Sequence, residues 1–470
     1  LGDVYKRQKL RMTFEDIIST SHLKRLFYSH LHSSGVRGND SVLPTAFESR
    51  LEEEINIIQT KTRIQTYTFT YYREKLISKG AKHFPRVLSI PTVRDRLLLL
   101  ALKEYLHLIF PECINRDLPN KKIADLYKYM QQHSDSAYLK TDIKGFYDHI
   151  DHTILFGLLK EKIEDERILS LLWKAIHNPT VPFPCTTQRK QKEKPTIGIP
   201  QGLSISNILS EIYMSDFDLM MKNRFPFYSR YVDDMLFFTN GPLKTGRQEI
   251  RDNLKRKKLH WNLSKTSSGK KVQEIVYLGY LISPQKITVP EEKVSRFIRR
   301  IAGVFTEFKK QYQQPEYCPV HYKNRPEALK AYFLEELNKK IAGVKSGKKR
   351  YGWICYYSQL TDIILLNRID HIIISFFRQS EIFDYQKPES LKSVTRAYYE
   401  LKKGKNSYLY DYDTLNTPEK KRAELIRHNL IREEHSYSPE IIERLYNRFL
   451  VRSLYSFEKD SGIINGKNSG

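Results

Sequence analysis

The stretch FYSRYVDDMLFFT, residues 227–239, places two adjacent aspartates between two runs of aromatic and aliphatic residues. Runs of this composition are typical of half-buried β-strands, so the stretch predicts a β-hairpin with Asp233 and Asp234 at its tip. Aspartate is a poor strand residue, and neighbouring carboxylates repel each other. A bound divalent cation would explain the pair, whereas a solvated acidic turn is the alternative, because Asp is common in turns. The stretch alone leaves both interpretations open.

The composition indicates a polyanionic partner. The 470 residues hold 79 Lys and Arg against 54 Asp and Glu, a net charge of +25, together with 31 Tyr and 23 Phe that could stack on bases. No apolar run approaches the roughly 20 residues of a membrane-spanning helix, so we expect a soluble protein with no membrane partner. The four cysteines are far apart and form no CxxC pair, which predicts neither a zinc site nor a disulfide framework and fits the cytoplasm.

A further carboxylate stands at the end of a predicted strand. Residues 137–143, AYLKTDI, have strand composition and contain Asp142 next to the last position. Neighbouring strands of one sheet would bring Asp142 beside the hairpin aspartates. Residues 148–152, DHIDH, resemble a ligand cluster, but a helix is predicted from Thr153, and we expect these side chains to cap it.

The segment before residue 92 predicts a basic hairpin. Its strands are residues 67–73 and 86–90, and the turn between them carries lysines. The cations Lys79, Lys82 and Arg86 either form a solvated face or point at phosphates.

The remaining pattern is mostly helical. Helices are predicted over residues 12–60, 92–110 and 206–221, the last directly after a Pro-Gln-Gly turn. Residues 274–283 have strand character, and no further strand pair is predicted from Pro290 onward.

Five short motifs follow one another along the chain. They are Asp142 with Phe146 and Tyr147, then Pro200-Gln201-Gly202, then Tyr231-Val232-Asp233-Asp234, then Lys265, and then Tyr277-Leu278-Gly279. In this order and at these approximate spacings they resemble palm motifs A to E of reverse transcriptases. The resemblance covers about residues 60–385 and is strongest to bacterial reverse transcriptases related to group II introns and retrons.

The resemblance implies an α+β fold of the right-hand polymerase type, with fingers, a palm built on an antiparallel sheet and a helical thumb, plus a mainly helical C-terminal extension. The implied division is N-terminal helices and fingers over 1–135, palm over 136–285 with a fingers insertion near 155–200, thumb over 286–385 and extension over 386–470.

The activity implied by the resemblance is RNA-directed DNA polymerase, a nucleotidyltransferase that makes cDNA. Phosphoryl transfer of this kind uses two Mg²⁺ ions, with Mn²⁺ as a substitute, at the primer 3′-hydroxyl and the triphosphate. The metal ligands that it implies are Asp142, Asp233, Asp234 and the backbone carbonyl of Ile143. Lys265 is implied as a general acid toward the leaving pyrophosphate.

The resemblance also implies a nucleotide-binding surface and a primer grip. Basic finger residues would hold the triphosphate, and Tyr147, which stands where the family has its steric gate, would exclude a ribose 2′-hydroxyl and so select dNTPs. The residues implied as nucleotide-binding are Lys79, Lys82, Arg86, Phe146, Tyr147, Gln201 and Gly202, and those implied as primer grip are Tyr277, Leu278 and Gly279.

Features outside the palm bear on the class of reverse transcriptase. Intron-encoded enzymes often add a Cys/His endonuclease, and retron enzymes usually show Val-Thr-Gly near the thumb, where this chain reads Tyr277-Leu278-Gly279-Tyr280. We therefore expect a defence-associated enzyme of the "unknown group", which copies a structured noncoding RNA in bacterial anti-phage defence. The alternatives are a retron or group II intron-type reverse transcriptase or maturase, and an RNA-binding scaffold that does not polymerise. The expected partners are the RNA template, the DNA product and dNTPs, and a homo-oligomer is compatible with the sequence.

The C-terminal part carries two more expectations. The basic segments 345–350 (KSGKKR) and 420–422 are predicted to bind structured RNA through its phosphates, with a solvated face as the alternative. A tyrosine between residues 398 and 412 could act as a protein primer, but packing or stacking on RNA bases is the favoured role of these rings.

Overall fold

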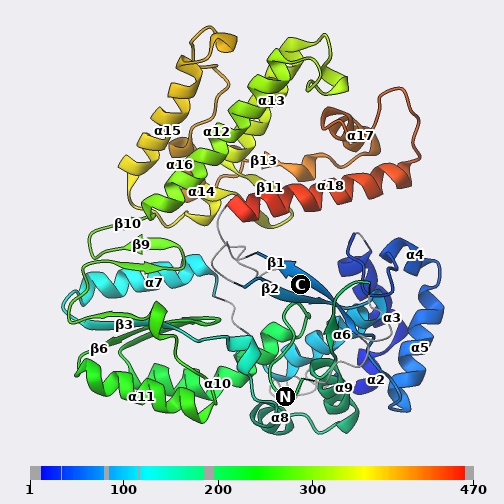
Figure 1. Ribbon diagram of the computed structural model, residues 1–470, viewed down its shortest axis with the longest axis vertical. Helices are drawn as coiled ribbons and strands as arrows, with labels where there is room; N and C mark the ends of the chain where they lie inside the picture. The colour runs from blue at the N-terminus through cyan, green and yellow to red at the C-terminus, as the bar shows by residue number, and fades with distance from the viewer. Residues whose placement is uncertain (1–11, 33, 79–83, 115–116, 185–194, 461–470) are drawn as a thin grey trace, which may run out of the picture. The chain divides into compact units, whose positions relative to one another are not determined.

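The computed structural model describes residues 12–460 apart from 33, 79–83, 115–116 and 185–194 (Figure 1). The chain forms two compact units. Among the described residues, unit 1 comprises 12–116 and 135–271, and unit 2 comprises 117–134 and 272–460. Both units combine helices with small, mainly antiparallel sheets, so the predicted α+β class is confirmed. The predicted division into fingers, palm, thumb and extension stays a prediction.

Unit 1 begins with helices packed on one long buried helix. The elements are α2 (Phe14–Ile17), α3 (Thr20–Leu26), a π-helical turn (Phe27–Leu31), α4 (Pro44–Glu48), α5 (Leu51–Arg63) and α6 (Val93–Ile109). The hydroxyl of Thr92 caps α6 by accepting a hydrogen bond from the backbone N–H of Asp95. The run of leucines in α6 is buried, which places the centre of the unit 1 core along this helix.

A three-stranded sheet contains the predicted basic hairpin. Strand β1 (Tyr72–Ile77) pairs antiparallel with β2 (Arg86–Ile90) and parallel with β4 (Thr180–Val181). The hairpin is therefore confirmed, but its first strand starts at Tyr72 and not at residue 67. The reason is that Asp95 binds this segment: it accepts hydrogen bonds from the Tyr67 hydroxyl at 2.7 Å and from the backbone N–H of Thr70 at 3.1 Å.

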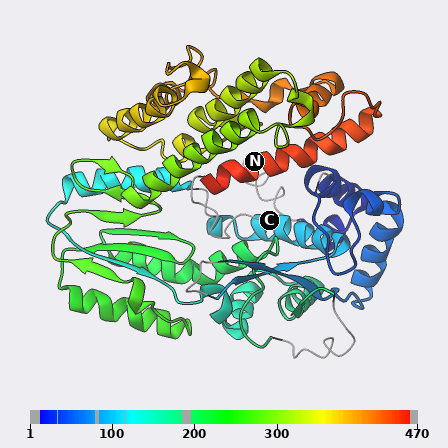
Figure 2. The ribbon, with the colours of Figure 1, turned by 45° about the horizontal axis from the view of Figure 1, so that its top comes forward.

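The main sheet of unit 1 has four antiparallel strands in the order β5-β6-β3-β7. They are β3 (Ala137–Asp142), β5 (Phe227–Tyr231), β6 (Asp234–Thr239) and β7 (Ser267–Gly269). The predicted hairpin around the two aspartates is β5 and β6, and the predicted strand that ends at Asp142 is β3. Helices α10 (Ser206–Arg224) and α11 (Leu243–Arg256) cover one face of the sheet, and Figure 2 shows α11 along its outer side.

Residue alternation determines which side chains face these helices. Leu139 of β3 and Met235 of β6 belong to the same buried core as Ile250 of α11. Since successive side chains of a strand point to opposite faces, Asp142 and Asp234 lie on the other face of the sheet. The helices and the aspartates are thus on opposite sides of these strands.

The segments between β3 and α10 support the sheet. A 3₁₀ turn (Phe146–His149), α8 (His152–Lys160) and α9 (Glu166–Ile176) lead toward β4. Asp151 caps α8 by accepting the backbone N–H of Ile154 at 3.0 Å, which is the capping role expected for the DHIDH stretch.

Unit 2 is mostly helical and contains two small sheets. Its helices are α7 (Pro119–Gln132), α12 (Glu291–Gln313), α13 (Pro326–Ala342), α14 (Trp353–Tyr356), α15 (Ile363–Arg378), α16 (Val394–Lys402), α17 (Pro418–Arg427) and α18 (Pro439–Asp460). Its strands are β8 (Ile275–Tyr277), β9 (Tyr280–Ile282), β10 (Ile287–Thr288), β11 (Val344–Ser346), β12 (Lys349–Tyr351) and β13 (Tyr410–Asp411).

One prediction for unit 2 was confirmed and one was wrong. The strand character predicted over residues 274–283 is confirmed: these residues form a hairpin, in which Leu278 and Gly279 have φ of +44° and +85° and form the turn between β8 and β9. A strand pair also exists beyond Pro290, because KSGKKR folds into the β11–β12 hairpin. Each of these strands is three residues long and contains lysine, which is depleted in β-strands, so the sequence does not predict them as strands.

The C-terminal segment packs onto the helices before it through a buried charge cluster. Lys339 of α13 is 1% exposed, and its ammonium group lies 3.2 Å from Glu424 of α17 and 4.0 Å from the centre of the Tyr410 ring. Glu335 and Glu336 also contact this ammonium group, at 3.1 and 2.7 Å. A buried lysine is tolerated only when carboxylates surround it in this way, so these contacts make the C-terminal segment part of unit 2.

Across the described ranges of residues 12–460, no helix combines the length and the apolar character needed to cross a bilayer.

Candidate active site

The tip of the β5–β6 hairpin is a two-residue turn, Val232-Asp233, closed by the pairing of Tyr231 with Asp234. Val232 has a φ of +60°, in the left-handed region that a β-branched residue rarely adopts. Backbone strain of this kind persists only where the surrounding structure enforces it, and it is concentrated at functional sites. The turn is therefore a place where the fold holds Asp233 and Asp234 in a fixed position.

The three predicted aspartates come together at one end of the main sheet. Asp142 is the direct cross-strand neighbour of Asp234. The backbone N–H of Ile143 donates a hydrogen bond of 3.0 Å to the carbonyl oxygen of Asp233. The carboxylates of Asp142 and Asp234 are only partly buried, so both remain within reach of solvent.

Cationic and amide side chains hold these carboxylates. Lys265 donates to one oxygen of Asp142 at 3.1 Å, and Asn262 donates to the other at 3.2 Å. The Lys140 ammonium group lies 3.8 Å from Asp234. Sequence reasoning found Lys265 but missed Lys140, although its position two residues before Asp142 puts it on the same face of β3. The positive charges offset the repulsion between the aspartates.

The donor chemistry at this edge fits a divalent cation. Mg²⁺ binds carboxylate and carbonyl oxygens, and Asp142, Asp233, Asp234 and the carbonyl of Ile143 offer such atoms from adjacent strands. Within the described part of the chain, no three His, Cys, Asp or Glu side chains are arranged as a ready metal-binding group. The side chain of Asp142 is instead engaged by Asn262 and Lys265.

The loop after β3 carries the predicted gate residue. Gly145, with a φ of +55°, turns the chain into the 3₁₀ turn that bears Phe146 and Tyr147. Phe146 is 3% exposed and packs in the core beneath this loop, whereas Tyr147 is half-buried. Burial raises the pKa of the Tyr147 hydroxyl, and the carboxylates of Glu211 and Asp233 act in the same direction, so the ring lies near the aspartate edge.

The Pro-Gln-Gly segment runs beside this loop and beside β2. The backbone N–H of Ile199 donates to the carbonyl of Tyr147 at 2.8 Å, and the N–H of Ser89 on β2 donates to the carbonyl of Gln201 at 2.7 Å. The Gln201 amide donates to Asp148 at 3.3 Å. Gly202 has a φ of +106°, and a Cβ atom there would lie 3.0 Å from the Ser89 carbonyl, so the close approach to β2 requires glycine.

A cavity of about 290 Å³ opens along this segment. It is lined by β2 residues Val87 and Ser89, by Asp148, and by residues 197–201. Arg86, the predicted triphosphate contact, stands at the start of β2 and is part-buried. The structure thus gathers β2, the gate loop and Gln201 around one cavity.

The other predicted residues lie elsewhere. Lys79 and Lys82 fall outside the described residues. Tyr277, Leu278 and Gly279 belong to unit 2, where Tyr277 is fully buried and the carbonyl of Leu278 accepts a hydrogen bond from Tyr356 at 2.6 Å.

A buried arginine ties the hairpin to α10. The Arg230 side chain is 4% exposed and lies 2.7 Å from Glu211 and 2.5 Å from Asp218, both on α10. It also donates to the carbonyl of Val232 at 2.9 Å. Burial would lower the pKa of Arg230, but the charges of Asp218 and Glu211 raise it well above its usual value, so the guanidinium stays charged. Sequence reasoning missed this residue, whose partners are far from it in the chain.

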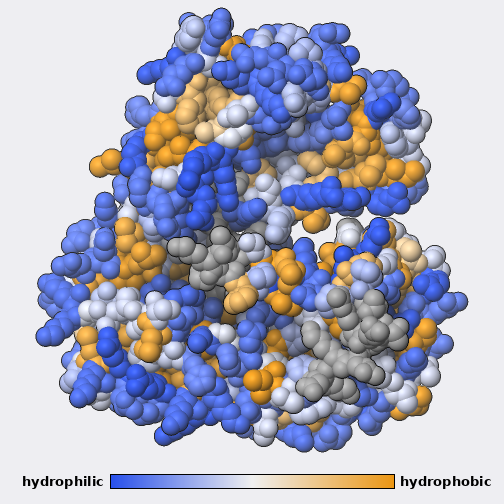
Figure 3. Space-filling model, in the orientation of Figure 1, coloured by the Kyte–Doolittle hydropathy of each residue, from blue (hydrophilic) through white to orange (hydrophobic). Residues whose placement is uncertain are grey.

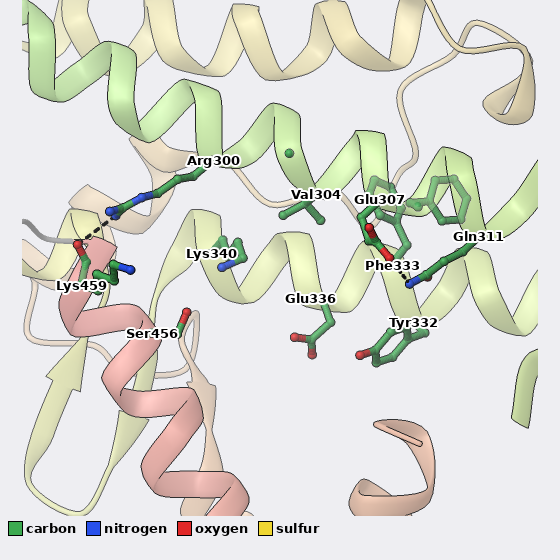
Figure 4. Close-up of a pocket in the computed structure, with 12 residues that line it drawn as sticks. Arg300, Val304, Glu307, Gln311, Tyr332, Phe333, Glu336, Lys340, Ser456 and Lys459 are labelled. Atoms are coloured by element: carbon green, nitrogen blue, oxygen red, sulfur yellow. Dashed lines mark hydrogen bonds between the residues drawn. The ribbon is translucent and has the colours of Figure 1, made fainter. Parts of the chain in front are cut away.

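A larger cavity, of about 560 Å³, lies within unit 2 between α12, α13 and α18 (Figure 4). Arg300, Lys340 and Lys459 gather at one end of it, and Glu307 lies toward the other. None of the predicted site residues lines this cavity.

Comparison with known proteins agrees with the geometry in unit 1. Residues 77–282 match the family model described as "Reverse transcriptase (RNA-dependent DNA polymerase)". The chain carries a reverse transcriptase domain. This domain includes every predicted metal ligand together with the gate residue, the Pro-Gln-Gly segment and the hairpin, and it is consistent with a bacterial reverse transcriptase.

Relatives of the reverse transcriptase domain include proteins of group II introns and retrons. The group II intron-encoded protein LtrA of Lactococcus lactis subsp. cremoris is 28% identical over 208 residues, which cover 42% of this chain and 34% of LtrA. The Retron Ec83 reverse transcriptase of Escherichia coli is 28% identical over 182 residues, which cover 36% of this chain and 54% of that protein. The chain thus spans only about a third of LtrA and about half of the retron enzyme.

Among solved structures, telomerase from Candida albicans in complex with a TWJ fragment of telomeric RNA aligns with a TM-score of 0.43 at 14% identity. The alignment covers 89% of this chain and 67% of that chain. A likeness at this level carries no conclusion about function.

Proposed function

We propose that the chain is an RNA-directed DNA polymerase that extends a primer 3′ end with dNTPs. The observation that carries the proposal is the direct pairing of Asp142 with Asp234 across β3 and β6, beside the strained turn that bears Asp233. Carboxylates held close together destabilise the fold, and a protein that served only as a scaffold would gain nothing from this arrangement. A polymerase needs this arrangement, because its carboxylates bind the cations of phosphoryl transfer.

The residues of this edge have distinct proposed roles. Asp142, Asp233 and Asp234, with the carbonyl of Ile143, are the ligands of two divalent ions. When bound, such ions lower the pKa of the attacking hydroxyl and neutralise charge on the triphosphate. Lys265, whose ammonium group lies 3.1 Å from Asp142, is the proposed general acid toward the leaving pyrophosphate.

The cavity beside Gln201 is the proposed place for the incoming nucleotide and its template partner. Arg86 on β2 supplies a positive charge for the triphosphate, and Gln201, fixed by Asp148 at 3.3 Å, lies along the nucleotide. Tyr147, which lies on the same 3₁₀ turn as the cavity-lining Asp148, is proposed to exclude a ribose 2′-hydroxyl with its ring. Selection of dNTPs then rests on steric exclusion by this ring.

For the biological role, we propose that the enzyme copies a structured noncoding RNA in anti-phage defence. A net charge of +25 supports an RNA partner, and the helical C-terminal segment, joined to unit 2 through Lys339 and Glu424, supports an enzyme with its own extension after the thumb. Sequencing the nucleic acid that copurifies with the protein identifies the template. Phage plating efficiency should fall in cells that express the wild type and should recover with Asp233→Asn.

Primer extension tests the polymerase itself. Wild-type protein is incubated with a primed RNA template, dNTPs and Mg²⁺, and Asp233→Asn is compared with it. Asn keeps the side-chain volume but weakens cation binding, so we expect DNA synthesis to fall at least about a hundredfold, the scale of losing one group that stabilises transition-state charge. Asp252→Asn, at an exposed position of α11, is the matched control and should retain full activity. DNA synthesis by Asp233→Asn at the wild-type rate would overturn the proposal.

A further inference from the structure

The exposed face of α11 carries a straight row of four cations, which we call the α11 row. It consists of Lys244, Arg247, Arg251 and Lys255, all of them exposed. Their spacings of three, four and four residues keep them on one side of a helix with 3.6 residues per turn. At a rise of about 1.5 Å per residue, the row is roughly 16 Å long.

The apolar face of α11, which adjoins the row, shows that this orientation is fixed by packing. Gly246, Ile250 and Leu254 are buried against the sheet, and the Gly246 position meets the ring of Phe225. The helix cannot rotate without exposing these apolar groups, so the row stays on the exposed flank of α11. There Arg247 also donates to the Ser268 hydroxyl, and Arg251 lies over the Trp261 ring. In Figure 3 the surface over α11, at the lower left, is mostly hydrophilic.

The row differs from the other basic segments in having no acidic partner. None of its four cations forms an ion pair with any residue in the described part of the chain. The acids of α11 are used differently: Glu249 pairs with Arg224 at 2.7 Å, and Asp252 accepts a hydrogen bond from Gln248 at 2.9 Å.

Each of the two basic segments predicted from sequence has one lysine neutralised by carboxylates. In the KSGKKR hairpin, Lys345 pairs with Asp411 at 3.0 Å and with Asp413 at 3.6 Å. In the second segment, Lys421 pairs with Glu443, and Lys420 bonds the carbonyl of Thr414 at 3.2 Å. Each of these segments thus has one cation in an ion pair, whereas none of the four cations of the row is in one among the described residues.

The row lies on the sheet face opposite Asp142, although Arg251 reaches within 5.9 Å of the centre of the Trp261 ring, next to Asn262, which donates a hydrogen bond to Asp142. Ile250 and Leu254 share a core with Leu139 and Met235, which face α11, whereas Asp142 points to the other side of the sheet. The phosphates that contact the row are therefore different from the phosphates that enter the candidate active site.

We infer that the α11 row is a second RNA-binding surface, which holds a part of the RNA that is not being copied by contacts to its phosphates. The inference rests on the proposed function only for the choice of RNA as the polyanion. A single row of cations matches the linear charge of one nucleic-acid strand. An anionic membrane is less suited, because on α11 itself the large apolar side chains Ile250 and Leu254 are buried and cannot insert.

The test compares two variants with equal loss of charge. The row variant replaces Lys244, Arg247, Arg251 and Lys255 with Gln. The control variant replaces four exposed cations that are scattered over other elements with Gln, namely Lys61, Lys323, Arg432 and Arg452. Fluorescence anisotropy measures binding to a labelled RNA hairpin with long single-stranded arms and to a short primer–template duplex, each over a series of salt concentrations.

We expect the row variant to bind the long RNA at least about tenfold more weakly, and the slope of log affinity against log salt to fall by about 3, since each lost phosphate contact accounts for about 0.7 on a single strand. The control variant should keep the wild-type slope, and both variants should bind the short duplex like the wild type. Equal losses in the two variants, or an unchanged slope in the row variant, would overturn the inference. Loss of binding to anionic vesicles with RNA binding intact would also overturn it and would assign the row to membranes.

This result is independent of catalysis. Binding is measured without dNTPs, so a protein that fails to polymerise could still show the effect of the row. Conversely, an active enzyme whose row variant binds long RNA normally would retain the proposed function and lose only this inference.

Discussion

The guanidinium group of Arg230 donates a hydrogen bond of 2.9 Å to the carbonyl oxygen of Val232, the residue of positive φ that precedes Asp233. The same guanidinium group is bound by Glu211 and Asp218 of α10, the helix that follows the Pro-Gln-Gly segment. A buried ion pair of this kind is weak support for stability, and its value lies in fixing one geometry. Here it fixes the turn that carries Asp233.

Arg230→Lys should therefore reduce DNA synthesis while the protein stays folded. Lysine keeps the positive charge that Glu211 and Asp218 require. Its single ammonium group cannot donate to both carboxylates and to the Val232 carbonyl at once, as the planar guanidinium group does. We expect the Mg²⁺ concentration for half-maximal activity to rise severalfold, because the aspartate beside the turn is less well positioned. The measurement is initial primer-extension rate against Mg²⁺ concentration.

Arg224→Lys is the matched control, since Arg224, the last residue of α10, forms a partly exposed ion pair with Glu249 of α11. Exposed pairs contribute about 0–1 kcal/mol, so this variant should behave like the wild type. An unchanged Mg²⁺ dependence in Arg230→Lys would show that the arginine serves stability alone.

Tyr147→Ala should relax discrimination against ribonucleotides. Removing the ring opens the space where a 2′-hydroxyl would sit, and a steric difference of this size is worth about tenfold or more in relative incorporation. Competition between dNTP and rNTP on one template measures it. Tyr147→Phe keeps the ring and should discriminate like the wild type. If alanine discriminates as well as tyrosine, the gate is formed by another residue.

Much of unit 1 could be predicted from sequence because its signals are local. The alternation around Asp233 and the strand that ends at Asp142 each specify an element, and placing both aspartates in one sheet follows from the fold class. The Arg230 cluster could not be predicted, because its partners Glu211 and Asp218 come from a helix whose rotation is known only after packing.

The misses in unit 2 have similar causes. The β11–β12 hairpin consists of short, lysine-rich strands that β13 completes from a distant part of the chain, and Lys345 is paired with Asp411 on that strand. The contact of Lys339 with Glu424 joins residues 85 positions apart. Interactions of this kind depend on tertiary packing, and no local pattern reports them.

Glu424→Gln should destabilise unit 2 in a pH-dependent way. Burial would raise the pKa of Glu424, but the hydrogen bond from His428 and the charge of Lys339 outweigh it and lower the pKa to about 2. Because the pKa of Glu424 is lower in the folded state than in the unfolded state, its charge stabilises the fold at every pH above the unfolded-state pKa of about 4.5. This stabilisation is lost as the pH falls from there toward the folded-state pKa of about 2. Because Glu335 and Glu336 still face Lys339, we expect a loss of about 1–3 kcal/mol at pH 7.

Denaturant unfolding at several pH values measures this effect. The difference between wild type and Glu424→Gln should be constant above about pH 5 and should shrink at lower pH. Glu443→Gln, which removes a more exposed partner of Lys421, should cost less than about 1 kcal/mol. A difference that stays the same down to pH 3 would contradict the role given to the Glu424 charge.

The tyrosines between residues 398 and 412 separate into packed rings and one exposed ring, Tyr399. Tyr412 is 3% exposed, and Tyr398 is buried with its hydroxyl donating to Leu360 at 2.5 Å, whereas Tyr399 is 47% exposed. Burial raises the pKa of Tyr412 to about 12, which disfavours its use as a nucleophile. We expect cDNA to carry no peptide after protease digestion. If an adduct is found, Tyr399→Phe should abolish it and Tyr412→Phe should not.

The central claim is that Asp142 and the hairpin aspartates together support DNA synthesis on RNA. The most direct measurement is single-turnover primer extension on an RNA template by the wild type and by Asp142→Asn, over a range of Mg²⁺ concentrations and with circular dichroism to verify folding. We predict Mg²⁺-dependent synthesis by the wild type and a folded Asp142→Asn protein that is at least about a hundredfold slower at every Mg²⁺ concentration. Wild-type rates in the folded variant, or the absence of dNTP incorporation by the wild type, would contradict it.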